Sequence, residues 1–212
     1  MNKGVISVLV AYLIWGLYPF YFHAMQHVAP AEIVIHRVLW TFALLAVYLF
    51  CSRRWRWIQK AVTDKRTVAV FLMSSALITA NWSTYTYAIV TNQTLEASLG
   101  YFMNPLVSVL LGTVFLKEKL NKAQMLAIIF ACAGVMWVTF KQGEFPALGL
   151  TLALTFGFYG LVRKMAPLGS LEGLTLETAF AFPVALLATF YFAGNGDLTF
   201  VNGTGWDKFW LI

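Results

Sequence analysis

The sequence predicts an all-α membrane protein, a multi-span helical bundle. Hydrophobic residues make up 60% of the 212 positions and charged residues only 11%, whereas an average soluble domain is about 25% charged. The few charges leave seven long windows that contain no Asp, Glu, Lys or Arg. Because the helices of a soluble protein must present a polar face to water, this pattern excludes a soluble globular fold.

The charge-poor windows have the length that membrane-spanning helices require. Crossing a hydrocarbon core takes roughly 20 mostly apolar helical residues. We expect seven spans, at Gly4–Phe22, Ile33–Cys51, Thr67–Val90, Leu95–Leu116, Ala123–Phe140, Ala147–Val162 and Leu174–Ala193. A further apolar stretch, Trp206–Ile212, resembles the opening of an eighth span. The second span is unusual, because it includes ionisable residues at its start.

Lysine and arginine gather in alternate links between the spans. With the N-terminus inside, the inner segments would hold Lys3, Arg53, Arg54, Arg56, Lys60, Lys65, Arg66, Lys117, Lys119, Lys122, Arg163 and Lys164, and the outer side Arg37, Lys141 and Lys208. Cytoplasmic loops carry an excess of such residues. Twelve against three predicts a multi-pass protein of the cell membrane with a cytoplasmic N-terminus. This topology also accounts for the net charge of +6 without a nucleic-acid partner.

The chain also contains a weak internal repeat at an offset of 141 positions. Without a gap, Leu9, Leu13, Gly16, Tyr18 and Leu45 meet Leu150, Leu154, Gly157, Tyr159 and Leu186. An offset of five spans is odd, so the second copy is inverted in the membrane, as in many secondary transporters. We expect a first five-helix repeat at 1–140 and, at 141–212, a partial second inverted repeat with helices six, seven and the start of eight. The chain would then be a fragment of a ten-helix transporter; the alternative is a complete seven-span protein with a hydrophobic tail.

Ionisable residues open the second predicted span. Glu32 and His36 are four positions apart, so they share a helix face, and Arg37 follows directly. Ionisable groups at membrane depth usually face a bundle interior or an aqueous cavity; the alternative is that they anchor the helix end at the headgroups. The repeat places His36 opposite Glu177 in the seventh span. The two copies would therefore carry ionisable groups at matching depths on opposite sides, which suits coupling or gating.

A block of polar and aromatic residues fills the end of the third span. Asn81, Thr84 and Tyr85 fall on one helix face by their spacing. They could line a cavity in which aromatic walls hold an organic solute and polar atoms orient it. Hydrogen bonding between helices is the alternative, since Ser, Thr and Asn side chains often serve it in membrane bundles.

The fourth span begins with a small and polar face. Glu96, Gly100 and Asn104 recur at every fourth position, and Pro105 removes a backbone hydrogen bond. The segment Trp15–Pro19 in the first span forms a similar weak point, or a kink at which a glycine lets helices approach closely. Irregular backbone at membrane depth is tolerated where it is buried in protein or faces water.

These observations define two candidate sets. The candidate substrate-binding residues are Trp15, Tyr18, Asn81, Trp82, Tyr85, Tyr101 and Asn104, and the candidate coupling or gating residues are Glu32, His36, Arg37, Glu96 and Glu177. Protons are a candidate coupling ion, because the charge of His36 can respond to a modest pH change. The sequence has no HExxH, Walker A or GxSxG motif and no metal-ligand cluster. We therefore expect neither an enzyme nor a cofactor or metal.

Several blocks resemble the RarD-type permeases, in the EamA branch of the drug/metabolite transporter superfamily. The blocks are AYLIWGLYPFYF at Ala11–Phe22, PAEIVIHRVLW at Pro30–Trp40, LEASLGYFMNPLVSVLLGTVFLKEKL at Leu95–Leu120 and LTFGFYGLVRK at Leu154–Lys164. The resemblance implies ten helices in two inverted repeats, a central cavity and transport of small organic solutes, with chloramphenicol sensitivity as the family label. Glu118 meets the family's acidic position after the fourth helix. The alternative function is a membrane receptor or sensor, which would not require an inverted repeat.

Overall fold

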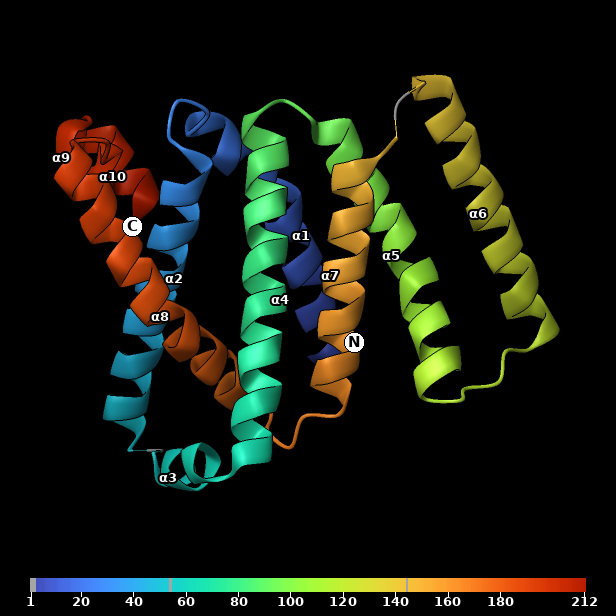
Figure 1. The fold of residues 1–212 in the computed structure, drawn as a ribbon, viewed down its shortest axis with the longest axis horizontal. Helices are drawn as coiled ribbons and strands as arrows, with labels where there is room; N and C mark the ends of the chain where they lie inside the picture. The colour runs from blue at the N-terminus through green and yellow to red at the C-terminus, as the bar shows by residue number, and fades with distance from the viewer. Residues whose placement is uncertain (1–2, 54, 144) are drawn as a thin grey trace.

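The computed structural model describes residues 3–53, 55–143 and 145–212, and within these ranges it consists of helices and connecting loops without a strand. The helices are α1 (Lys3–Ala24), α2 (Pro30–Ser52), α3 (Arg56–Thr63), α4 (Lys65–Val90), α5 (Thr94–Phe115), α6 (Lys122–Gln142), α7 (Ala147–Lys164), α8 (Ser170–Asn195), α9 (Thr199–Asn202) and α10 (Gly205–Leu211) (Figure 1). Of the twelve basic residues assigned to the inner side, Arg54 lies outside the described ranges.

Six helices are long and apolar enough to cross a membrane, namely α1, α2, α4, α5, α6 and α8. This confirms an all-α membrane protein. The sixth predicted span, Ala147–Val162, does form a helix, but α7 is not among the six by length and composition. Its 18 residues end with Arg163 and Lys164 in the last turn, so its apolar part is shorter than a typical span. The short helices α3 and α9 lie in links for which the sequence predicted no helix. The short helix α10 overlaps Trp206–Ile212, the stretch that resembled the opening of an eighth span.

The centre of the bundle consists of α4, α5 and α7, with α2 and α8 packed along the other side of α4 (Figure 1). The most extensive contact joins α5 and α7, and glycines make it close. A Cβ added to Gly100 would lie 2.8 Å from Leu152 Cβ, and one added to Gly149 would lie 2.9 Å from the Glu96 carbonyl oxygen. The predicted small and polar face of the fourth span is therefore the surface on which α7 packs.

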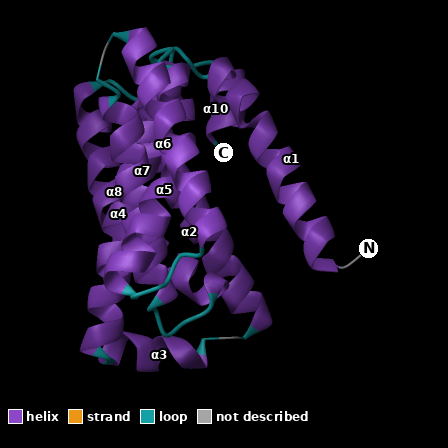
Figure 2. Ribbon diagram, turned by 90° about the vertical axis from the view of Figure 1, so that its right-hand side faces the viewer, coloured by secondary structure: helices purple, strands orange, loops and turns teal. Residues whose placement is uncertain are grey.

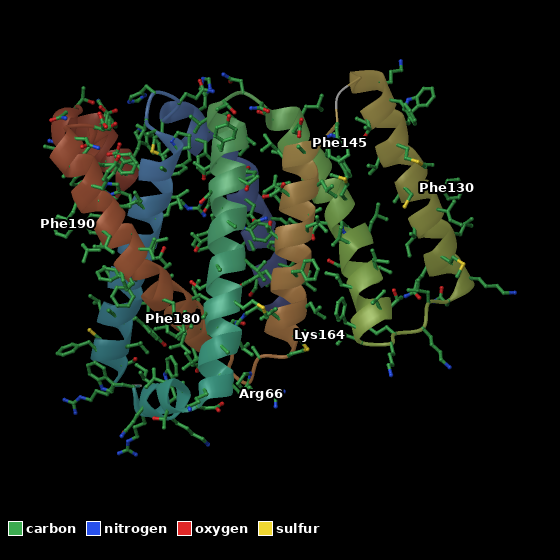
Figure 3. All side chains as sticks on the ribbon, in the orientation of Figure 1. Arg66, Phe130, Phe145, Lys164, Phe180 and Phe190 are labelled. Atoms are coloured by element: carbon green, nitrogen blue, oxygen red, sulfur yellow. The ribbon has the colours of Figure 1, made fainter. Side chains whose placement is uncertain are left out.

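Helices α1 and α6 lie at the periphery. In Figure 2, α1 diverges from the bundle toward its N-terminal end, and most of its side chains are exposed. Figure 3 shows Phe130 of α6 and Phe190 of α8 pointing away from the bundle, and both are exposed. A helix that is hydrophobic on all sides suits a membrane span, so these surfaces are suited to contact lipid chains.

The expected weak points lie within continuous helices. Pro19 is inside α1 and Pro105 is inside α5. A Cβ added to Gly16 would meet open space, so Gly16 does not mark a close helix approach. Of the two alternatives for this segment, a close helix approach at Gly16 is therefore not found among the described residues, and a weak point at Trp15–Pro19 stays a prediction.

Candidate solute-binding site

A guanidinium surrounded by aromatic rings lies between α1, α2 and α4. The Arg37 Cζ atom is 4.8 Å from the centre of the Trp82 ring, 5.8 Å from that of Tyr18 and 5.9 Å from that of Phe22. Such distances allow cation–π attraction. Among the residues that the structure describes, no carboxylate forms an ion pair with Arg37. We call these four residues the arginine–aromatic cluster.

A cavity of about 290 Å³ adjoins the arginine–aromatic cluster. It is lined by Tyr18, Tyr21, Arg37, Trp40, Thr41, Leu44, Trp82, Leu174, Leu211 and Ile212. The indole N–H of Trp40 is buried and has no hydrogen-bond partner in the described part of the chain. Walls that combine aromatic and aliphatic side chains with polar groups are typical of small-molecule sites, and the volume is just below the range usual for them.

An aromatic chain connects the arginine–aromatic cluster to α5. The Phe22 ring is fully buried and lies 5.8 Å from the Tyr18 ring and 5.6 Å from the Tyr85 ring, and Tyr85 lies 5.8 Å from Tyr101, centre to centre. Sequence reasoning missed Phe22. Its spacing of four residues from Tyr18 on one helix could have indicated the contact.

The structure separates the seven candidate substrate-binding residues. Tyr18 and Trp82 line the cavity, and Tyr85 and Tyr101 belong to the aromatic chain. Trp15 is 59% exposed, packs edge-on against Tyr12 on its own helix and does not line the cavity.

Asn81 and Asn104 are not among the residues that line the cavity. The Asn81 amide donates to the Leu152 carbonyl and to the Thr155 hydroxyl, both at 3.0 Å. These bonds join α4 to α7 and match the alternative of hydrogen bonding between helices. The buried Oδ1 atom of Asn104 has no partner among the described residues.

Two of the predicted coupling residues cap helices elsewhere in the chain. The Glu32 carboxylate accepts the Thr199 and Phe200 amides at 3.0 and 2.7 Å, and Glu96 accepts the Leu148 amide at 3.0 Å and the Gly149 amide at 3.4 Å. The first amides of a helix have no partner within it, and a carboxylate satisfies them and suits the positive end of the helix dipole. Glu32 thus caps α9 and Glu96 caps α7.

His36 is buried on α2, one turn from Glu32. Its ring lies 4.6 Å from the Phe200 ring, and neither ring nitrogen has a hydrogen-bond partner in the described ranges. A buried polar group without a partner is costly. Both ring nitrogens of His36 are therefore buried and unsatisfied among the described residues, unlike the carboxylates of Glu32 and Glu96.

Glu177 lies near the opposite end of the bundle in a network that joins α4, α7 and α8. Its carboxylate accepts the Ser74 hydroxyl at 2.7 Å and the Tyr159 hydroxyl at 3.3 Å, and it lies 3.6 Å from the Arg163 Nε atom. The Ser75 hydroxyl donates to the Glu177 carbonyl at 2.7 Å. The network leaves the buried Nη1 atom of Arg163 without a hydrogen-bond partner among the described residues, but its other bonds join three helices and hold them in one arrangement.

Glu118, the acidic residue after α5, pairs with Lys164 at the end of α7, with 2.5 Å between Oε1 and Nζ. Both side chains are more than half exposed, so this pair contributes little to stability. Glu96 and Glu118 nonetheless contact α7 at its two ends.

A bundle of apolar helices beside a cavity with aromatic walls and a guanidinium defines a multi-pass membrane protein with a candidate solute site. The chain belongs to the EamA-like transporter family, whose model matches residues 2–140, and it is a member of the RarD type. It is 42% identical to an uncharacterized transporter, YojE, of Bacillus subtilis. The 188 aligned residues cover 87% of this chain and 63% of that relative.

RarD proteins show the same relationship. The chain is 39% identical over 194 residues to protein RarD of Salmonella typhi, covering 92% of this chain and 66% of the relative. It is 29% identical over 215 residues to the chloramphenicol-sensitive protein RarD of Pseudomonas aeruginosa, covering 100% and 71%. The chain therefore spans a little under two thirds of the length of YojE and of the Salmonella protein. No solved structure matches it significantly.

Proposed function

We propose that the protein is a secondary transporter that moves small organic solutes, drugs or metabolites, across the cell membrane. The observation that carries this proposal is the cavity, in which Tyr18, Trp40 and Trp82 supply aromatic walls and Arg37 a charge. Membership of a transporter family supports translocation rather than binding alone. The receptor alternative has no observation in its favour.

The two-repeat organisation, 1–140 and 141–212, is part of the proposal. The shift of 141 positions relates α2 to α8, and these two helices pack against each other along the bundle (Figure 1). His36 and Glu177, which the shift also relates, are both buried and lie in separate clusters on α2 and α8. In transporters with inverted repeats, one repeat moves against the other at their interface during alternating access. The contact between α2 and α8 would be part of that interface.

A cytoplasmic N-terminus is proposed from the charge distribution. The α3 region, the α5–α6 link and the end of α7 share one end of the bundle (Figure 1), and Arg66 and Lys164 mark that end in Figure 3. These segments hold most of the twelve basic residues assigned to the inner side. The positive-inside rule would place that end in the cytoplasm.

Protons are proposed as the coupling ion, with His36 and Glu177 as the groups that respond to them. His36 faces the Phe200 ring and has Glu32 one turn away, whereas Glu177 faces Ser74, Tyr159 and Arg163. Glu32, Glu96 and Arg37 are less suited to carry protons, because the two carboxylates cap helices and a guanidinium stays protonated.

The test is transport into everted membrane vesicles from cells that produce the protein, compared with vesicles from cells that do not. Chloramphenicol is the first solute to test, because one relative is named for sensitivity to it. We expect protein-dependent movement of a solute that an imposed pH gradient accelerates. Saturable binding of the same solutes without net movement would instead identify a receptor.

A further inference from the structure

We propose that the cavity takes an organic anion, a small aromatic or aliphatic body bearing one carboxylate, with Arg37 as the residue that binds the carboxylate. This inference rests on the proposed function and names the substrate class of the same site. It assigns Arg37 to substrate binding, where the sequence pattern had suggested coupling or gating.

The first argument is the missing partner of the Arg37 guanidinium. Charged side chains within membrane spans normally pair with one another. The two buried carboxylates of the described residues are already engaged, since Glu32 accepts the two α9 amides and Glu177 binds Ser74, Tyr159 and Arg163. Within the described part of the chain, the charge of Arg37 is therefore left for a ligand.

The second argument is the way in which Arg37 is held. The Trp82, Tyr18 and Phe22 rings contact its guanidinium without using its N–H donors, because a ring face attracts a cation but accepts no strong hydrogen bond. A guanidinium has five donors in a fork that matches a carboxylate. The rings thus fix the position of the charge and leave its fork for an anion.

The third argument is the composition of the cavity. Tyr21, Trp40, Leu44 and Leu211 give it apolar surface beside its polar groups, and this surface suits an apolar body of the ligand. The unpaired N–H of Trp40 offers one further donor, and no Asp or Glu side chain is among the described residues that line the cavity. An anionic head with a ring-sized body satisfies the charge, the donors and the volume together.

The experiment measures binding to the purified protein in lipid nanodiscs by isothermal titration calorimetry. The probes are phenylacetate, its neutral isostere phenylacetamide and the cation phenethylamine. We expect phenylacetate to bind about tenfold or more tightly than phenylacetamide, because a lost charge-assisted hydrogen bond has roughly that effect. Phenethylamine should bind more weakly than either.

Arg37→Gln should remove the preference for phenylacetate over phenylacetamide, and Arg37→Lys should retain only part of it, because a lysine keeps the charge without the fork. The matched control is Lys141→Gln. Lys141 is exposed, lies 5.8 Å from the Trp137 ring centre and does not line the cavity. The Lys141→Gln substitution therefore removes one cation–π contact and one charge, and it should leave the preference for phenylacetate unchanged.

Equal affinity of the unmodified protein for phenylacetate and phenylacetamide would overturn the inference, and this result needs no variant to fold. Survival of the preference in Arg37→Gln would overturn it as well. Transport of neutral or cationic solutes in vesicles, together with no binding of phenylacetate, would contradict this inference but support the proposed function. Arg37-dependent binding of phenylacetate without transport of any solute would support this inference but contradict the proposed function.

Discussion

The Glu32 carboxylate on α2 accepts the backbone N–H of Phe200 at 2.7 Å, although the two residues are 168 positions apart. Its other oxygen accepts the Thr199 N–H at 3.0 Å. Glu32 is only 1% exposed, so water cannot replace either bond. One carboxylate thus holds the link that follows α8 against the start of α2, beside the buried His36.

Glu32→Gln should destabilise the protein by about 1–3 kcal/mol, because an amide supplies one acceptor and leaves the other buried N–H without a partner. Thermal unfolding of the detergent-purified protein measures the change. Asp197→Asn is the control, since Asp197 is exposed in the link before α9. An equal melting temperature for Glu32→Gln and the unmodified protein would show that the cap does not matter.

Asn81→Ala should reduce the amount of folded protein and the transport activity in parallel, because its amide joins α4 to α7 through the Leu152 carbonyl and the Thr155 hydroxyl. The expected loss of stability is roughly 1–3 kcal/mol. Ser83→Ala is the control, as the exposed Ser83 hydroxyl bonds within its own helix. Lost transport at normal abundance and stability would instead return Asn81 to the solute site.

Glu177→Gln should lower stability and remove the pH dependence of transport that the coupling proposal requires. The stability loss, roughly 1–3 kcal/mol, arises because Arg163 loses its charged partner and because the amide keeps an acceptor for only one of the Ser74 and Tyr159 hydroxyls, which bind different oxygens of Glu177. Adding Arg163→Gln should restore part of it, since a double-mutant cycle isolates the pair. A wild-type transport rate and pH profile in Glu177→Gln would make Glu177 structural only.

Asp207 should contribute a pH-dependent step in stability. The Thr204 backbone N–H, then the Thr204 hydroxyl and then His27 lower the pKa of the Asp207 carboxyl below its usual range. A depressed folded-state pKa gives stability that is present above the unfolded value, about 3.9, and is lost as the pH falls through the folded value.

The measurement for Asp207 is the melting temperature as a function of pH, compared between the unmodified protein and Asp207→Asn. The two curves should differ above about pH 4 and converge at lower pH. Curves that stay parallel across the whole range would mean that the Thr204 and His27 contacts do not bind the charged form of Asp207.

The orientation predicts that Gln59, exposed on α3, faces the cytoplasm. With Cys51 and Cys132 replaced by serine, Gln59→Cys should react with an impermeant maleimide only in everted vesicles. A cysteine at Gly143, which follows α6 at the opposite end, serves as the control and should react in intact cells. Labelling of Gln59→Cys from outside intact cells would reverse the proposed topology.

Sequence reasoning found the helices because their signal is local. A run of apolar residues long enough for a membrane can be read directly, and α1, α2, α4, α5, α6 and α8 follow from it. It also placed α7 and the start of α10, although α7 is not among the helices long and apolar enough to cross a membrane. It missed the short helices α3 and α9, where turn and capping chemistry decides the helix. The family was also accessible, because blocks such as Leu95–Leu120 preserve residue order regardless of packing.

The sequence by itself therefore determined the class of protein, the apolar helices and the residues that carry polar groups into the membrane. Only the tertiary structure decided what those groups contact. Helical spacing shows that Glu32 and His36 share a face. The two amides that Glu32 caps, however, belong to Thr199 and Phe200, which are 167 and 168 positions away. The same holds for Asn81 and α7, and for the rings around Arg37. Such contacts depend on how helices pack, and apolar packing surfaces in a membrane look alike in sequence because lipid and neighbouring helices both accept them.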